Sequence, residues 1–377
     1  MSGASLLDQF LKKIVQLGAS DLHLKTERPP LMRLKGDLVP MEGASPLSAE
    51  DVQREIYSVT STAQQKKLEE TKELDFSFQM RGVARFRGNV FYQRGALSAV
   101  FRAIPAAIPS VEDLGLPPVL KELIIRPQGL FLVTGPTGSG KTTTLASLVQ
   151  HVNENFPKHI ITIEDPIEFT YEDSKSAVNQ REVGADTFDF TQALRRALRQ
   201  DPDVILMGEL RDRETITTAI TAAETGHLVL GTMHTNDAKQ SLSRILDIFP
   251  ADAQGQVRVQ LAAALICVVS QRLVKRANGS GRVAAVEVLI NTPSIRKLIE
   301  ENRVGGITKV MEESASFYKM QTFNQALFNL IQAGTISPEE AFAISENPND
   351  LKIQMQTQGV AVSSAPKPGL PPGLAGA

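Results

Sequence analysis

One segment has the residue types and spacing of a phosphate-binding loop. It reads Gly135-Pro136-Thr137-Gly138-Ser139-Gly140-Lys141-Thr142, with Thr143 directly after it. The glycines let the backbone curl until several N–H groups face one point, and the start of a helix adds positive potential there. The spacing therefore predicts that residues 135–143 hold the phosphates of a nucleotide, most simply ATP.

Two side chains of this loop supply further chemistry. Lys141 is expected to reach the β- and γ-phosphates, and the hydroxyl of Thr142 to ligate Mg²⁺. An apolar strand expected at 129–134 enters the loop, and a helical pattern continues over 143–149. A strand before and a helix after the loop favour a phosphate site over a chance glycine-rich turn.

Other polar residues also come directly after apolar strands. Glu164 follows the strand expected at 159–163, Glu209 follows the one at 203–207, and His234 comes just after the one at 227–232. The carboxyl ends of parallel strands meet at one edge of an open sheet, where ligands bind. We therefore expect these three side chains to surround, with Lys141, the terminal phosphate of one nucleotide.

The chemistry of hydrolysis suggests a role for each of these residues. Glu209 is expected to hold the magnesium shell together with Thr142, and Glu164 to orient or activate the attacking water. His227 and His234, one strand apart, are expected to sense the γ-phosphate. The simpler alternatives are surface charge for the glutamates and a structural hydrogen bond for each histidine.

Composition narrows the class of protein. Of the 377 residues, 42% are hydrophobic and 22% are charged, which is typical of a globular protein with about two domains. The single cysteine, Cys267, excludes an internal disulfide and a cysteine-based zinc site. The apolar stretch at 261–269 is far shorter than the roughly 20 residues that cross a bilayer. A net charge of −2 gives no reason to expect a nucleic-acid partner.

Periodicity and composition divide the chain into segments. Residues 1–104 combine an opening helix with short strands, which predicts a small α/β domain. The proline-rich residues 105–109 are expected to be a stiff linker. Residues 110–356 alternate strands and helices, which predicts a mostly parallel sheet covered by helices. Residues 357–377 are dominated by Pro, Gly and Ser and are expected to form a disordered tail, or a partner-binding peptide.

The strands expected in the first domain are 21–25, 31–34, 75–80, 84–93 and 97–104, and the second domain adds a strand at 283–290 to those named above. Its clearest helical patterns cover 191–199 and 213–225.

Four motifs resemble those of the secretion and pilus ATPases. Residues 19–24 match the family's N-terminal signature, 163–168 its Asp box, 207–212 its Walker B motif, and 223–235 its His box. The resemblance covers residues 1 to about 350. It implies an ATP hydrolase with a RecA-like P-loop NTPase domain, a smaller PAS-like α/β N-terminal domain, and a homohexameric ring at the cytoplasmic face of the inner membrane.

The chain is most similar to the retraction branch of that family. Assembly and secretion members usually carry an extra N-terminal domain and a four-cysteine zinc motif, which this chain does not show. Residues 294–303 agree with half of the branch's C-terminal signature, at Ile295, Arg296, Leu298, Ile299 and Glu301. The resemblance implies type IV pilus retraction and twitching motility, with an inner-membrane platform protein and an accessory retraction ATPase as partners. A pilus assembly or type II secretion ATPase, and an accessory retraction subunit, are the alternatives.

An arginine is also needed where charge develops in the transition state. By the resemblance, the strand that carries Arg85 and Arg87 faces the nucleotide at a subunit boundary. Salt bridging on an exposed strand is the alternative for both. ATP would then clamp the N-terminal domain against the P-loop domain, with 105–109 as the hinge. Two rival classes are a nucleic-acid motor and a non-catalytic nucleotide-binding scaffold.

Overall fold

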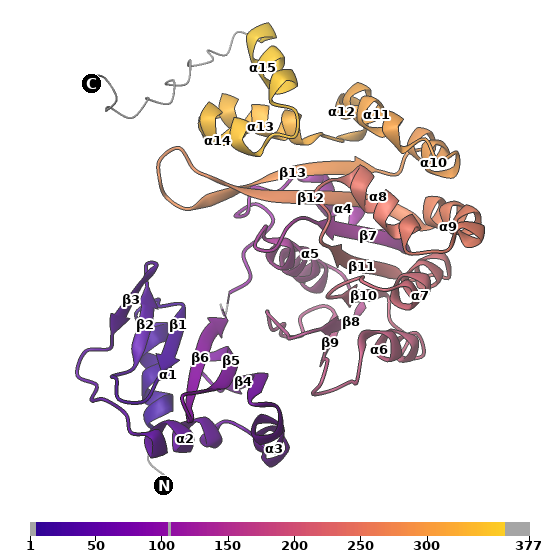
Figure 1. Cartoon of the computed structure of the whole chain (residues 1–377). Helices are drawn as coiled ribbons and strands as arrows, with labels where there is room; N and C mark the ends of the chain where they lie inside the picture. The colour runs from indigo at the N-terminus through magenta and orange to yellow at the C-terminus, as the bar shows by residue number, and fades with distance from the viewer. Residues whose placement is uncertain (1–4, 105–106, 359–377) are drawn as a thin grey trace, which may run out of the picture. The chain divides into compact units, whose positions relative to one another are not determined.

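The computed structural model describes residues 5–104 and 107–358, which form two compact units (Figure 1). The first unit contains the described part of 1–108 together with 164–172 and 182–186. The second contains 109–163, 173–181 and the described part of 187–377. Of the proposed linker, residues 105 and 106 lie outside the described residues. Each unit has its own sheet, and the predicted α/β class is confirmed.

The first unit is built on a six-stranded sheet in the order β3-β2-β1-β6-β5-β4, with antiparallel neighbours. Its strands are β1 Asp21–Leu24, β2 Leu31–Leu34, β3 Asp37–Pro40, β4 Glu73–Met80, β5 Ala84–Gln93 and β6 Ala96–Ile104. Its helices are α1 Leu6–Gln16, α2 Ala49–Ser58 and α3 Thr62–Thr71.

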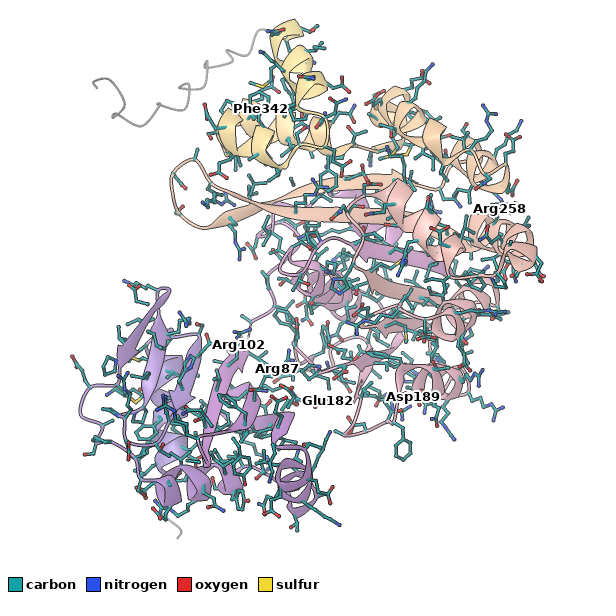
Figure 2. All side chains as sticks on the ribbon, in the orientation of Figure 1. Arg87, Arg102, Glu182, Asp189, Arg258 and Phe342 are labelled. Atoms are coloured by element: carbon teal, nitrogen blue, oxygen red, sulfur yellow. The ribbon has the colours of Figure 1, made fainter. Side chains whose placement is uncertain are left out.

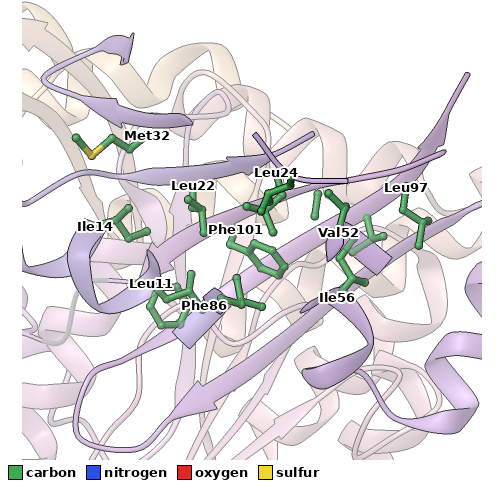
Figure 3. Close-up of a cluster of buried hydrophobic side chains, with 14 of the residues drawn as sticks. Leu11, Ile14, Leu22, Leu24, Met32, Val52, Ile56, Phe86, Leu97 and Phe101 are labelled. Atoms are coloured by element: carbon green, nitrogen blue, oxygen red, sulfur yellow. The ribbon is translucent and has the colours of Figure 1, made fainter. Parts of the chain in front are cut away.

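The core of this unit lies between the sheet and the helices (Figure 3). Leu7, Leu11 and Ile14 recur at helical spacing on α1, and all three are buried. Along most of β5, buried residues alternate with less buried ones, which turns Phe86 into the core, and Phe101 of β6 is also buried. Full burial of each large apolar side chain contributes roughly 1.5–3 kcal/mol to folding.

The second unit is built on a seven-stranded sheet in the order β13-β12-β7-β11-β10-β8-β9. β12, β7, β11, β10 and β8 run parallel, and β13 is antiparallel to β12. The strands are β7 Gly129–Thr134, β8 His159–Glu164, β9 Ala177–Glu182, β10 Val204–Met207, β11 Leu228–Met233, β12 Leu265–Lys275 and β13 Arg282–Ile290. The mostly parallel sheet that the alternation predicts is therefore present.

Helices pack against this sheet. α7 contacts β7 and β11, α8 contacts β12 and β13, and α13 lies on β13. The longer helices of the unit are α5 Lys141–Asn155, α6 Phe190–Ala197, α7 Arg213–Glu224, α8 Ala238–Asp247, α9 Ala251–Ala264, α10 Pro293–Glu300, α13 Phe323–Gln332 and α15 Pro348–Thr357. The shorter ones are α4 Val119–Leu123, α11 Ile307–Glu313, α12 Ala315–Tyr318 and α14 Pro338–Ile344, with a 3₁₀ turn at Val304–Gly306.

The end of the chain differs slightly from expectation. Thr357, where the tail was expected to begin, is still the last residue of α15. Residues 359–377, the rest of that tail, lie outside the described residues. Among the helices of the described ranges, none has both the length and the apolar character needed to cross a membrane.

Candidate nucleotide-binding site

The loop between β7 and α5 has the backbone that a phosphate cradle requires. Gly135, Gly138 and Gly140 have φ angles of 146°, 78° and 90°, a region that residues with a Cβ rarely adopt. α5 begins at Lys141, so the N–H groups of its first turn and the positive end of its dipole lie at the loop. These residues can therefore surround an anion with N–H donors.

Lys141 is held over the loop rather than in solvent. Its Nζ donates to the carbonyl oxygens of Gly135 at 2.8 Å and Pro136 at 3.1 Å, and the residue is only 8% exposed. A buried ammonium is costly unless it is hydrogen-bonded, and these carbonyls offset part of that cost. Thr142 follows directly, so its hydroxyl lies at the same end of α5.

The strand registers bring four strand ends to one edge of the sheet. Met233, at the end of β11, pairs with Thr134, directly before the loop. Met207, at the end of β10, pairs with Ile163, directly before Glu164. The carboxyl ends of β7, β11, β10 and β8 therefore share one edge, as the sequence predicts.

Glu209 lies at this edge among charged and titratable neighbours. Its Oε1 lies 2.5 Å from Nε of Arg211 and 3.4 Å from Nε2 of His234. Its side chain is 19% exposed, whereas that of His234 is 42% exposed. The structure thus brings Glu209 and His234 together, as expected from their places after β10 and β11.

Glu164 is the last residue of β8 and is buried. Its backbone carbonyl accepts a hydrogen bond from the N–H of Val183, within the first unit. Burial and the charge of Glu164 raise the pKa of Tyr171 well above its usual value. Glu164 therefore lies buried at the end of β8, close enough to Tyr171 for its charge to act on that hydroxyl.

His227 lies at the other end of β11 from His234, and its expected role stays a prediction. His227 precedes β11 and its carbonyl accepts from the N–H of Gly129, at the start of β7, whereas His234 follows the end of β11. At about 3.3 Å per residue, the strand separates the two histidines by roughly 20 Å. Within one subunit, only His234 lies at the edge of the phosphate loop. The ring Nδ1 of His227 lies 3.2 Å from the carbonyl oxygen of Ala222, which is a structural contact.

The two arginines of β5 have different surroundings. An Nη of Arg85 lies 2.7 Å from a carboxylate oxygen of Glu182, and Ser77 donates to the same carboxylate. Glu182 also accepts from the N–H of Ile167, so it is buried with three kinds of partner. Arg87, labelled with Glu182 in Figure 2, is exposed and makes no ion pair among the described residues.

The side chains present fit a magnesium nucleotide. The hydroxyl of Thr142 and the carboxylate of Glu209 are hard oxygen donors, the kind that Mg²⁺ prefers. No cluster of three or more His, Cys, Asp or Glu that could hold a metal by itself occurs in ranges 5–104 and 107–358. Mg²⁺ commonly binds through few protein ligands and the phosphates, so a dedicated cluster is not needed.

The second unit has one cavity beside the phosphate loop and a larger one away from it. One of about 160 Å³ is lined by Gly140, Thr143, Thr144 and Gln271, with Arg276 nearby. A larger one of about 870 Å³ lies between β13, α13 and residues 115–119 and does not include the loop. The second cavity is larger, but the first is the one that borders the phosphate loop.

Comparisons with known proteins identify the family of the chain. The family described as "Type II/IV secretion system protein" matches residues 3–359. The "Type IV pilus retractation ATPase PilT" of Pseudomonas aeruginosa is 49% identical over 89% of this chain and 96% of that protein. The "Type IV pilus ATPase PilU" of the same organism is 42% identical over 93% and 91% of the two chains. A solved structure, "Crystal Structure of the Pilus Retraction Motor PilT and Bound ADP", has a TM-score of 0.87 at 48% identity, covering 93% of this chain and 100% of that one.

The chain belongs to the type II/IV secretion system protein family. It is an ATPase of the PilT kind within that family, as the motifs predict. The reading as a non-catalytic scaffold is thereby excluded.

Residues of the N-terminal and C-terminal signatures form ion pairs in the structure. Asp21 of the N-terminal signature is buried and its Oδ1 lies 2.8 Å from Nε of Arg102, which ties β1 to β6. Although burial acts in the opposite direction, hydrogen bonds from Ser20 and Arg102 leave the pKa of Asp21 below its usual value. In the C-terminal signature, Arg296 lies 3.2 Å from Glu300 on the exposed side of α10, a surface ion pair.

The loop that carries His234 is anchored by a residue that sequence reasoning missed. Ala238, the first residue of α8, donates its N–H to Oε1 of Glu287 on β13 at 2.7 Å. Glu287 is buried, and burial raises its pKa to about 7, with Asp237 and Glu346 adding to the rise while the Ala238 N–H and Lys239 oppose it. No sequence motif marks Glu287; only its position on a buried strand could have drawn attention to it.

Glu287 should make stability depend on pH. Because its pKa in the folded chain lies above the unfolded value, the folded chain binds an extra proton between the two pKa values, and stability falls as pH rises through about 7. Glu287→Gln keeps the acceptor oxygen without the charge. We expect it to raise the free energy of unfolding by on the order of 2 kcal/mol at pH 8, relative to wild type, and by much less at pH 5.

Urea unfolding at the two pH values measures this difference. Glu312→Gln, on the exposed side of α11, is the matched control. An equal gain at pH 5 and pH 8 for Glu287→Gln would contradict the assignment.

Proposed function

We propose that this ATPase powers retraction of type IV pili and thereby twitching motility. The observation that supports the proposal is the common edge of strand ends, from which the phosphate loop, Glu209 and His234 all follow, in a chain of the PilT kind. A motor needs repeated binding and hydrolysis at one site, and this edge provides donors for the phosphates and carboxylates for the metal and water.

Within the site, the residues divide the work. The N–H groups of residues 135–143 and the ammonium of Lys141 bind and orient the phosphates. Thr142 and Glu209 would hold Mg²⁺, which supplies charge stabilisation when bound. His234, beside Glu209, is placed to respond to the terminal phosphate. The cavity beside Thr143 and Thr144 takes the nucleoside end of ATP.

Glu164 is proposed to orient or activate the attacking water. A carboxylate is a group that can orient a water molecule and accept its proton. Its burial next to Tyr171 limits competition from bulk solvent.

Arg87 is the better of the two arginines for a role in a neighbouring subunit of a homohexameric ring. Arg85 is committed to Glu182 inside its own unit, whereas Arg87 is exposed on the same strand. An arginine supplied by another subunit would neutralise charge that develops on the transferred phosphoryl group.

The remaining proposals concern place and partners. A retraction motor would work in the cytoplasm against the inner-membrane platform protein of the pilus, with an accessory retraction ATPase. The higher identity to PilT than to PilU, 49% against 42%, favours the main retraction motor over the accessory subunit. A pilus assembly or secretion role is the second candidate.

Substitutions at the site should separate binding from hydrolysis. Lys141→Ala should abolish detectable nucleotide binding, because the loop loses its only ammonium. Glu164→Gln and Glu209→Gln should still bind nucleotide but lower kcat by about 10²–10⁴-fold. Titration with a fluorescent ADP analogue and release of phosphate measure the two properties. Glu214→Gln, on the exposed start of α7, is the control. Wild-type hydrolysis by both glutamine variants would refute the assigned roles.

Replacing Arg87 and replacing Arg85 should affect different properties, hydrolysis in the first case and stability in the second. Arg87→Ala should lower kcat by on the order of 10³-fold with little change in thermal stability. Arg85→Ala should destabilise the first unit by about 3–5 kcal/mol, because Glu182 is left buried without its cationic partner. The two readouts are ATP hydrolysis, measured on protein whose hexameric size has been confirmed, and thermal unfolding. If Arg87→Ala hydrolyses ATP normally as an intact hexamer, its role in the ring is excluded.

Deletion of the gene in its host tests the direction of work. A retraction motor predicts more surface pili and no twitching, which electron microscopy and a motility plate measure. Cells without pili would instead indicate assembly, and cells that still twitch would indicate an accessory role.

A further inference from the structure

β12 runs alongside β7 and ends beside the phosphate loop. The two strands are parallel, and Ser270 of β12 pairs with Thr134, the last residue of β7. Their hydroxyls are buried and hydrogen-bonded to each other, with Thr134 donating to Ser270 at 2.9 Å. The next residue, Gln271, is therefore the first on β12 that can reach past β7 into the loop.

The side-chain amide of Gln271 bridges the two flanks of Lys141. Its Nε2 donates to the backbone carbonyl of Ser139 at 2.8 Å, and its Oε1 accepts from the hydroxyl of Thr144 at 2.7 Å. A carbonyl can only accept, so the nitrogen of the amide must face Ser139. Gln271, Ser139 and Thr144 are each at most 3% exposed, so no solvent competes with these bonds.

The glycines of the loop are shaped by the same residue. A Cβ at Gly135 would collide with the backbone carbonyl of Gln271, and one at Gly140 would come within 2.8 Å of its side-chain nitrogen. Gly135 and Gly140 are therefore needed for two reasons. Each adopts a positive φ, and each lets the loop approach β12 more closely than a residue with a Cβ could. The loop is fitted to Gln271 along much of its length.

The bond to Ser139 also fixes a direction. In a trans peptide, the C=O and the following N–H point in opposite directions. Holding the Ser139 carbonyl against β12 thus turns the N–H of Gly140 away from β12, toward the inside of the loop. That N–H is one of the donors that a bound phosphate needs.

We propose that Gln271 is a positioning residue that holds the phosphate loop in its nucleotide-receiving shape. It acts through Ser139 and Thr144 and contacts no phosphate itself. Because the loop serves the ground state and the transition state alike, its loss should weaken binding of both to a similar extent. The inference rests on the proposed binding of ATP to residues 135–143.

The test compares Gln271→Ala with Gln321→Ala, a glutamine in the segment between α12 and α13 that bridges to Val288 of β13. Gln321 donates its Nε2 to the carbonyl of Val286 at 2.7 Å, and Val286 is the β13 partner of Gln271. Gln321→Ala removes the same kind of bond from the side away from the loop. Binding of a fluorescent ADP analogue, KM and kcat for ATP, and thermal unfolding without nucleotide are measured for each.

For Gln271→Ala we expect about a ten-fold or larger rise in the Kd for ADP and in KM, with kcat little changed. Gln321→Ala should lose similar stability but keep wild-type Kd and KM. Gln271→Glu retains the shape and the acceptor for Thr144 but loses the donor to Ser139, so it should also bind nucleotide weakly. This variant decides the matter if Gln271→Ala does not fold.

The outcomes separate this inference from the proposed site. Wild-type ADP affinity in a folded Gln271→Glu or Gln271→Ala, together with lost binding in Lys141→Ala, overturns the role of Gln271 alone. Wild-type affinity in Lys141→Ala as well means that nucleotide does not use this loop, which overturns the proposed site.

Discussion

The structure depends on a curled backbone at residues 135–140. Three glycines in the left-handed region let successive N–H groups turn inward, and no other residue could take their place without strain. β7 delivers the chain to this curl, and α5 begins directly after it. Such a backbone keeps one shape only if neighbouring elements hold it. We propose that β12 does so through the hydrogen bonds of Gln271 to Ser139 and Thr144.

The parallel sheet brings residues that are far apart in the sequence to the same edge. Glu164 and Glu209 are far apart in sequence, but β8 and β10 are neighbours whose carboxyl ends coincide in register. The chemistry then needs only that each strand be followed at once by its polar residue. The rest of each strand can be wholly apolar, as the burial of β10 and β11 shows. Along these strands the apolar residues form the core, and the polar residues of the site lie at or just after the strand end.

Much of this arrangement could be predicted because its signals are local. Glycine spacing, apolar strands and the polar residues after them lie within a few positions of one another. β12 was missed because α9 ends at Ala264 and β12 begins at Leu265, so the apolar run 261–269 gives no sign of the change. The strand carries no motif for Gln271, whose partners lie more than a hundred residues away.

His227 and Arg85 show what short patterns leave open. The His box places two histidines seven positions apart, but only the strand between them reveals that they point to opposite ends of the sheet. Arg85 alternates with Phe86 as an exposed arginine would, yet its carboxylate partner, Glu182, comes from a segment that the sequence gives no reason to connect with it. Long-range pairing of this kind follows from the folded chain alone.

A crystal structure with Mg²⁺ and a non-hydrolysable ATP analogue would test the central claim most directly. The account predicts that Nζ of Lys141 contacts the terminal phosphate, and that the carboxylates of Glu164 and Glu209 reach the metal, its waters or the in-line water at hydrogen-bond distance. A bound nucleotide whose terminal phosphate lies beyond the reach of both carboxylates, even through one bridging water, would contradict it.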